Sequence, residues 1–180
     1  TLHNTLFPYT TLFRSGLIEV GSLSETRDYV EIGELTPQMN ALTALNPNSV
    51  HIPVTRVNGV TTVITEPAGG LLPGSATLVN LHGYTPGQMH VGDFEAVVMD
   101  FPNTVRRGPW DDRSPEEIEE DAEEAMDRLN ELWDRAELYA HIDSSYAVSS
   151  GGKHPPEYVP AIEALVPVVR GEQQLMVRVN

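Results

Sequence analysis

Ile52-Pro-Val-Thr-Arg-Val-Asn-Gly-Val-Thr-Thr-Val-Ile-Thr65 is the stretch that decides the fold class of this chain. Its first half predicts a helix over residues 49–58, with Pro53 in the first turn, where proline is tolerated, and Gly59 in the capping position after the last turn. The β-branched residues 60–65 then predict a buried strand. A helix that passes directly into a strand is typical of a layered α/β protein.

Further elements are expected on the C-terminal side of this passage. A loop rich in Gly and Pro over residues 68–75 leads into an expected strand over 77–81. Two more strands are expected over 94–99 and 175–179, and a helix over 162–171 lies between them. The resulting order of helix, strand, strand, strand, helix, helix and strand favours a parallel α/β arrangement.

The longest expected helix runs from Pro115 to about Ala140. Ser114 and Glu117 form a Ser-x-x-Glu capping box, and Pro115 takes the first helical position, where no amide partner is needed. Its apolar residues recur at steps of three, four or seven and form one stripe: Ile118, Ala122, Ala125, Met126, Leu129, Trp133, Ala136 and Tyr139. Half of the chain's carboxylates lie between Asp111 and Glu137, and we interpret them as the solvated face of this helix rather than as a docking surface.

Composition excludes several classes of function. The chain has 180 residues, which suits one domain, and a net charge of −15 from 11 Lys+Arg against 26 Asp+Glu. This acidic balance argues against binding nucleic acid or anionic lipid, because both need a basic surface. The absence of cysteine excludes a disulfide scaffold, a thiolate zinc site and a cysteine nucleophile. No segment approaches the ~20 apolar residues of a membrane span, so we expect a soluble protein, either cytoplasmic or exported.

The glycine-rich loop is the first candidate for a substrate pocket. Glu66 directly follows the expected strand 60–65, and the glycines at 69, 70 and 74 would let a ligand approach the backbone closely. The loop matches neither a Walker A motif nor the dinucleotide fingerprint, so an ordinary turn is the alternative. His82 follows the strand 77–81 at the place where α/β folds carry functional groups. A solvent-exposed loop histidine is the interpretation that we favour for it.

Arg178 lies inside the last apolar strand. A charge on a buried strand needs a partner or a ligand, so Arg178 is also a pocket candidate. The alternative is that it marks the solvent end of the strand. The six histidines never form an HxH or HExxH pattern, so no local metal motif is present.

A resemblance to a known family extends over nearly all of residues 16–180. The stretches that carry it are GLIEVGS (16–22), ALTALNP (41–47), IPVTRVNGVTT (52–62), GGLLPG (69–74) and LVPVVRGE (165–172). They resemble the amidohydrolase superfamily, in particular its imidazolonepropionase-like metal-dependent hydrolases. The resemblance implies a (β/α)₈ TIM barrel with one or two divalent metals, zinc above all, at the C-terminal ends of its strands. It also implies that metal-activated water hydrolyses a non-peptide C–N bond of a small-molecule amide or cyclic amide.

The same resemblance implies that this chain is an internal piece, the N-terminal part of an incomplete barrel. Relatives read like His-x-His-x-Gly-Leu, so Gly16 stands just after the first two metal ligands. In their place, residues 5–15 match one reading frame of a common sequencing adapter, so we expect residues 1–15 to be non-native and 16–180 to be the domain.

The expected metal ligands are therefore absent from the chain. Arg178 stands where relatives carry a histidine, in a Val-His-Ala-Asn-like segment, and arginine cannot coordinate a metal while protonated. We therefore expect no metal and no catalysis in this piece alone. A non-catalytic, barrel-derived binding protein is the alternative for the parent.

Overall fold

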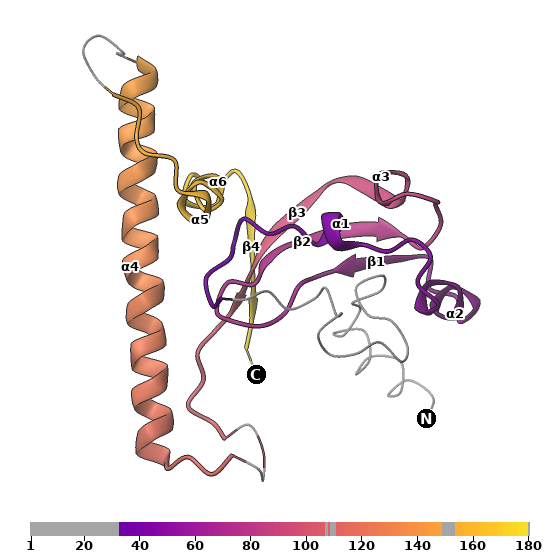
Figure 1. The fold of residues 1–180 in the computed structure, drawn as a ribbon, viewed down its shortest axis with the longest axis horizontal. Helices are drawn as coiled ribbons and strands as arrows, with labels where there is room; N and C mark the ends of the chain where they lie inside the picture. Colours follow the sequence, from indigo (N-terminus) through magenta and orange to yellow (C-terminus); the bar gives the residue numbers. More distant parts are fainter. Residues whose placement is uncertain (1–32, 107, 109–110, 149–153, 180) are drawn as a thin grey trace.

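The computed structural model describes residues 33–106, 108, 111–148 and 154–179 (Figure 1). The adapter-like segment and residues 16–22 lie outside the described residues. The elements, in chain order, are α1 (Ala41–Ala44), α2 (His51–Val57), β1 (Thr62–Thr65), β2 (Gly74–Asn80), α3 (Pro86–Met89), β3 (His90–Asp100), α4 (Pro115–Val148), α5 (Pro160–Glu163), α6 (Val166–Val169) and β4 (Gln174–Arg178). The fold is thus a mixed α/β arrangement, as the sequence predicts.

The strands form one open four-stranded sheet in the order β1-β2-β3-β4. The prediction of parallel strands is wrong for two of the three pairings, because β1/β2 and β2/β3 are antiparallel. Their connections, residues 66–73 and 81–89, are shorter than the dozen or so residues that a parallel crossover needs. Only the connection from β3 to β4 contains a long helix, α4, and this pair is parallel. A barrel is not seen among the described strands.

Strand direction decides which residues share an edge of the sheet. Because β2 runs antiparallel to both neighbours, β1 and β3 run in the same direction, and β4 follows β3. The C-terminal ends of β1, β3 and β4 therefore meet at one edge, which we call the carboxyl edge. The C-terminal end of β2 lies at the opposite edge.

Strand β1 is shorter and more exposed than the sequence suggests. It begins at Thr62, and its residues alternate between exposed and buried. The prediction of a fully buried strand is wrong because β1 is the first strand of the open sheet and only the face that carries Val63 and Thr65 is covered. Val63 belongs to a core cluster that joins the sheet to α2 and α3, with Leu45, Ile52, Val79, Leu81 and Met89.

The second core cluster joins the other half of the sheet to α4, which stands as a long column beside it with α5 and α6 in between (Figure 1). Its buried members are Leu72, Val97, Leu129, Leu132, Ala136, Ile162 and Leu165. Three of them, Leu129, Leu132 and Ala136, lie on α4 at steps of three and four. Leu129 and Ala136 belong to the predicted apolar stripe, whereas Leu132 lies on the same packed side but was not part of the prediction.

The predicted helix over 162–171 is two short helices. Pro167 explains the break, because proline has no N–H to donate to the carbonyl of Glu163 and its ring clashes with that carbonyl. The long helix, by contrast, runs on to Val148, past its predicted end. The hydroxyls of Ser144 and Ser145 donate to the carbonyls of Ala140 and His141 within these extra turns.

The capping box at the start of α4 is confirmed. The Ser114 amide donates to Glu117 Oε2 at 2.7 Å, and the Glu117 amide donates to Ser114 Oγ at 3.2 Å. Ser114→Ala is expected to lower the free energy of unfolding by about 1 kcal/mol, because one amide of the first turn loses its acceptor. Urea denaturation would measure this loss. Ser145→Ala, inside the same helix, is the matched control, and an equal effect in both variants would contradict the capping role.

Tyr139 on α4 provides a pH-dependent link to α5. A hydrogen bond with Glu163, followed by burial and the charge of Glu163, raises the pKa of Tyr139 from 10 to about 12. The folded chain therefore holds the phenolic proton more tightly than the unfolded chain. Its contribution to stability is present below pH 10 and is lost as the pH rises toward 12.

The absorbance difference between wild type and Tyr139→Phe isolates this titration. In the Glu163→Gln background, the pKa of Tyr139 is expected to fall back toward 10. Glu131→Gln, on the exposed side of α4, should leave this pKa unchanged. A titration that does not respond to Glu163→Gln would count against this hydrogen bond.

Candidate functional site

Three charged side chains from distant parts of the chain meet at the carboxyl edge. Glu66 directly follows β1, Asp100 is the last residue of β3, and Arg178 is the last residue of β4. Asp100 and Arg178 are also direct partners in the parallel register of β3 and β4. The sequence nominated Glu66 and Arg178 separately, and the structure brings them together. We call the three residues the carboxyl-edge triad.

The guanidinium of Arg178 is the centre of the triad. It donates from Nε and Nη2 to the two carboxylate oxygens of Asp100, at 2.5 Å each, so this pair is bidentate. Nη1 donates to Glu66 Oε1 at 3.0 Å and to the carbonyl of Pro67 at 3.4 Å. The side chains of Arg178, Glu66 and Asp100 are 21%, 12% and 23% exposed. The carboxylates of Asp100 and Glu66 therefore share the charge of Arg178 at a site that is largely shielded from solvent.

The charge of Arg178 is stabilised by its partners. Burial by itself would lower the pKa of the guanidinium, but the hydrogen bond with Asp100 and the charges of Glu66 and Asp100 outweigh it and raise that pKa. The positive charge of Arg178 is therefore favoured in the folded chain. The expectation that Arg178 needs a partner is met from within the chain. The expected burial of the strand is wrong, because no residue of β4 is buried and Arg178 ends the strand, as the alternative interpretation expected.

Sequence reasoning missed Asp100. It lies one residue past the predicted strand 94–99, and its proximity to Arg178 is set by register across 78 positions of sequence. The only signal in the sequence was the acidic Asp100 directly after an expected strand. This position indicates a contact with Arg178 only when β3 and β4 are known to be parallel neighbours.

Two of the predicted glycines, Gly70 in the loop before β2 and Gly74 at the start of β2, lie against the chain's own backbone. A Cβ on Gly70 would lie 2.6 Å from the Cα of Glu34, and a Cβ on Gly74 would lie 2.6 Å from the carbonyl oxygen of Met39. Gly69, Gly70 and Gly74 all have positive φ, at 94°, 75° and 138°. The close approach predicted for a ligand is therefore made here by residues 34–39, while contact of these glycines with a substrate stays a prediction.

Gly70→Ala is expected to lower the free energy of unfolding by about 1–3 kcal/mol, because the new methyl group meets backbone at a left-handed φ. Gly87→Ala is the control, since a Cβ there meets nothing within 4 Å and the residue lies in α3. Thermal unfolding of both variants would test the contrast. A Gly70→Ala chain as stable as Gly87→Ala would show that residues 34–39 can move away.

His82 is not part of the triad. It is exposed and follows β2, whose C-terminal end lies at the opposite edge of the sheet. The assumption of parallel strands put the ends of the strands before Glu66 and His82 at the same edge. The favoured interpretation of His82, an exposed loop histidine, agrees with its exposed position. Its role in a substrate pocket stays a prediction.

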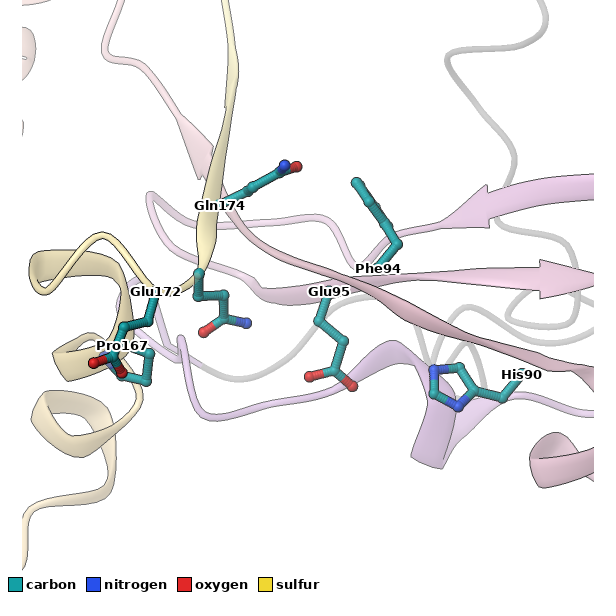
Figure 2. A pocket seen from close by; sticks show the side chains of 7 residues that line it. His90, Phe94, Glu95, Pro167, Glu172 and Gln174 are labelled. Carbon is teal, nitrogen blue, oxygen red and sulfur yellow. The ribbon is translucent and has the colours of Figure 1, made fainter.

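A hollow of about 460 Å³ lies near the beginnings of β3 and β4 (Figure 2). Its walls are formed by His90, Phe94, Glu95, Pro167, Glu172, Gln173 and Gln174. Glu95 already accepts a hydrogen bond from Asn40 Nδ2 at 3.1 Å, and Figure 2 shows Phe94 and Glu95 pointing to opposite sides of β3. Because the triad lies at the C-terminal ends of β3 and β4, the hollow near their beginnings lies away from it. None of the sequence-predicted pocket residues lines the hollow.

The residues present do not fit a metal centre. Across residues 33–106, 108, 111–148 and 154–179, no group of three or more His, Cys, Asp or Glu side chains is placed to hold an ion. At the carboxyl edge, both carboxylates already pair with Arg178, and a protonated arginine cannot be a metal ligand. None of the helices described is long and apolar enough to cross a membrane.

Comparison with known proteins supports the architecture. No protein-family profile and no curated protein sequence matches the chain. Its structure is similar to the crystal structure of an amidohydrolase from Thermotoga maritima MSB8, with a TM-score of 0.71 and 19% sequence identity. The fold is amidohydrolase-like. The match covers 91% of this chain and 42% of that one, so the chain spans about two-fifths of the length of the structure that it resembles.

Proposed function

We propose that this chain is part of a metal-dependent hydrolase of the amidohydrolase type, with residues 16–180 as the N-terminal part of a TIM-barrel domain. Its parent would hydrolyse a C–N bond of a small amide or cyclic amide other than a peptide bond. The observation that carries the proposal is the fold match to an amidohydrolase over 91% of the chain. The imidazolonepropionase-like stretches of the sequence support the same assignment.

The proposal places the metal, with zinc as the expected ion, on ligands outside the described residues. The described residues hold no group that fits it, and arginine stands at position 178, where the resemblance expects histidine. In the parent, we assign this chain a supporting role. Its triad joins the ends of β1, β3 and β4 and holds the carboxyl edge in one arrangement.

A binding protein without catalysis is the second candidate. It is favoured by the state of Arg178, whose Nε, Nη1 and Nη2 atoms all donate to residues of this chain. A guanidinium held in this way is a structural element rather than an open ligand position. Such a protein would retain the barrel-type fold and bind a small molecule without hydrolysing it.

The experiment that separates these functions uses the complete protein. The source locus would be resequenced across the junction of Ser15 and Gly16 and beyond Asn180, and the complete coding sequence would be expressed. Bound metal would be measured by plasma mass spectrometry. Hydrolysis would be followed on a panel of N-acyl amino acids and cyclic amides, before and after chelation.

We expect stoichiometric metal, and hydrolysis that chelation removes and zinc restores. A complete protein that binds panel members but contains no metal and releases no product would replace the hydrolase proposal with the binding protein. An encoded segment 5–15 followed by a stop codon after Asn180 would refute the assignment to a longer barrel.

A further inference from the structure

We propose that Arg178 is a built-in cation that closes the carboxyl edge to metal ions. Its guanidinium lies between Asp100 and Glu66 and donates to both carboxylates. The proposed function is the reason for asking about metal at this edge. The inference itself depends only on the contacts and charges of Arg178, Asp100 and Glu66. The inference goes beyond the proposed function because it assigns the Arg178 guanidinium to the space between the two carboxylates.

The guanidinium already uses the groups that a metal would need. Both oxygens of Asp100 accept from Arg178, and Oε1 of Glu66 accepts from Nη1 at 3.0 Å. Carboxylate oxygens are the ligands that hard divalent cations take, and zinc accepts them together with imidazole nitrogen. A metal ion could bind these carboxylates only by displacing the Arg178 guanidinium, which already donates hydrogen bonds to them.

The triad differs from a similar cluster around Arg113 in how its residues are brought together. Arg113 also lies between two carboxylates, but Asp111 and Asp121 are its near neighbours in sequence, and its side chain is 39% exposed. The partners of Arg178 are 78 and 112 positions away. The triad is therefore assembled by the sheet and is shielded by it.

Replacing the arginine with histidine tests the idea directly. Arg178→Gln would remove the cation and leave two carboxylates facing each other, whereas Arg178→His also adds an imidazole nitrogen beside them. Asp100, Glu66 and the new imidazole then provide three ligands of the kinds that zinc binds. The variant should gain a metal site that the described residues of the wild-type chain do not form.

The experiment compares thermal unfolding of the untagged 180-residue chain with and without zinc chloride after chelator treatment. We expect the wild-type midpoint to stay within about 1 °C and that of Arg178→His to rise by about 5 °C or more with saturating zinc. Cobalt absorption bands in the visible range, seen in the variant alone, would give an independent readout. If Arg178→His requires metal to fold, refolding yield with and without zinc measures the same gain.

Two variants act as controls. Arg178→Lys keeps a cation at the edge and should not respond to zinc. Arg170→His makes the same side-chain change at an arginine that pairs with one carboxylate, that of Asp143, and should not respond either. A response of Arg170→His equal to that of Arg178→His would overturn the proposal by showing that any new histidine suffices.

Zinc uptake by the wild-type chain that Glu66→Gln abolishes would also overturn it, because the edge would then be open with its arginine in place. A folded Arg178→His chain with no zinc response would do the same. The test uses neither substrate nor the complete protein. Its failure is thus distinguishable from failure of the hydrolase proposal, which is judged by metal and product in the full-length protein.

Discussion

Arg178→Ala is expected to lower the free energy of unfolding by about 3 kcal/mol, since removing one partner of a buried ion pair costs about 3–5 kcal/mol and this triad is partly exposed. The loss arises because Asp100 and Glu66 remain desolvated, without their shared cation and repelling each other. Urea denaturation at neutral pH would measure it.

Arg128→Ala is the matched control. Arg128 also pairs with two carboxylates, those of Glu34 and Glu124, but all three side chains are well exposed. Its loss should cost less than about 1 kcal/mol. Adding Asp100→Asn and Glu66→Gln to the Arg178→Ala chain should recover part of the stability, because no buried charge is then left unpaired. Equal losses in the Arg178 and Arg128 variants would mean that the triad is as solvated as a surface pair.

Leu165→Ala is expected to lower the free energy of unfolding by about 3 kcal/mol, within the 2–5 kcal/mol typical of Leu→Ala in a core. Leu165 is fully buried between α5 and α6 in the cluster that also holds Val97 of β3 and Leu132 of α4. Its truncation removes apolar contacts and leaves a cavity where the long helix packs on the sheet. The fall in the urea midpoint, with an unchanged slope, would measure the loss.

Leu138→Ala provides the comparison on α4 itself. Leu138 is 60% exposed, so its truncation should change the free energy of unfolding by less than about 0.5 kcal/mol. A small effect of Leu165→Ala would mean that α4 packs on the sheet less tightly than described. A large effect of Leu138→Ala would mean that the outer side of α4 is covered in solution.

Local sequence signals predicted the start and the packed side of α4 but not its end or the division of 162–171 into α5 and α6. The capping box of Ser114 and Glu117 and the stripe through Leu129 and Ala136 are confirmed, because both depend on residues three or four positions apart. Pro167 inside the expected helix 162–171 is a local signal for the break between α5 and α6, but the apolar spacing around it favours one continuous helix. The amidohydrolase-like fold is likewise supported, at the level of architecture, by the structural match.

Strand pairing could not be read from the same signals. The β-branched run of β1 indicates a strand but carries no information on the direction of its neighbour, and connection length was the clue to the antiparallel β1/β2 and β2/β3 pairs. This error moved His82 to the wrong edge of the sheet.

By itself, the sequence determined the capped start of α4, the acidic composition and the presence of a charge in the last strand, because these properties depend on composition or on neighbours within a few residues. The tertiary structure decided what that charge does. Glu66, Asp100 and Arg178 are brought together by strand order and register alone. Contacts between residues 78 and 112 positions apart arise from the packing of the whole sheet, so no local pattern encodes them.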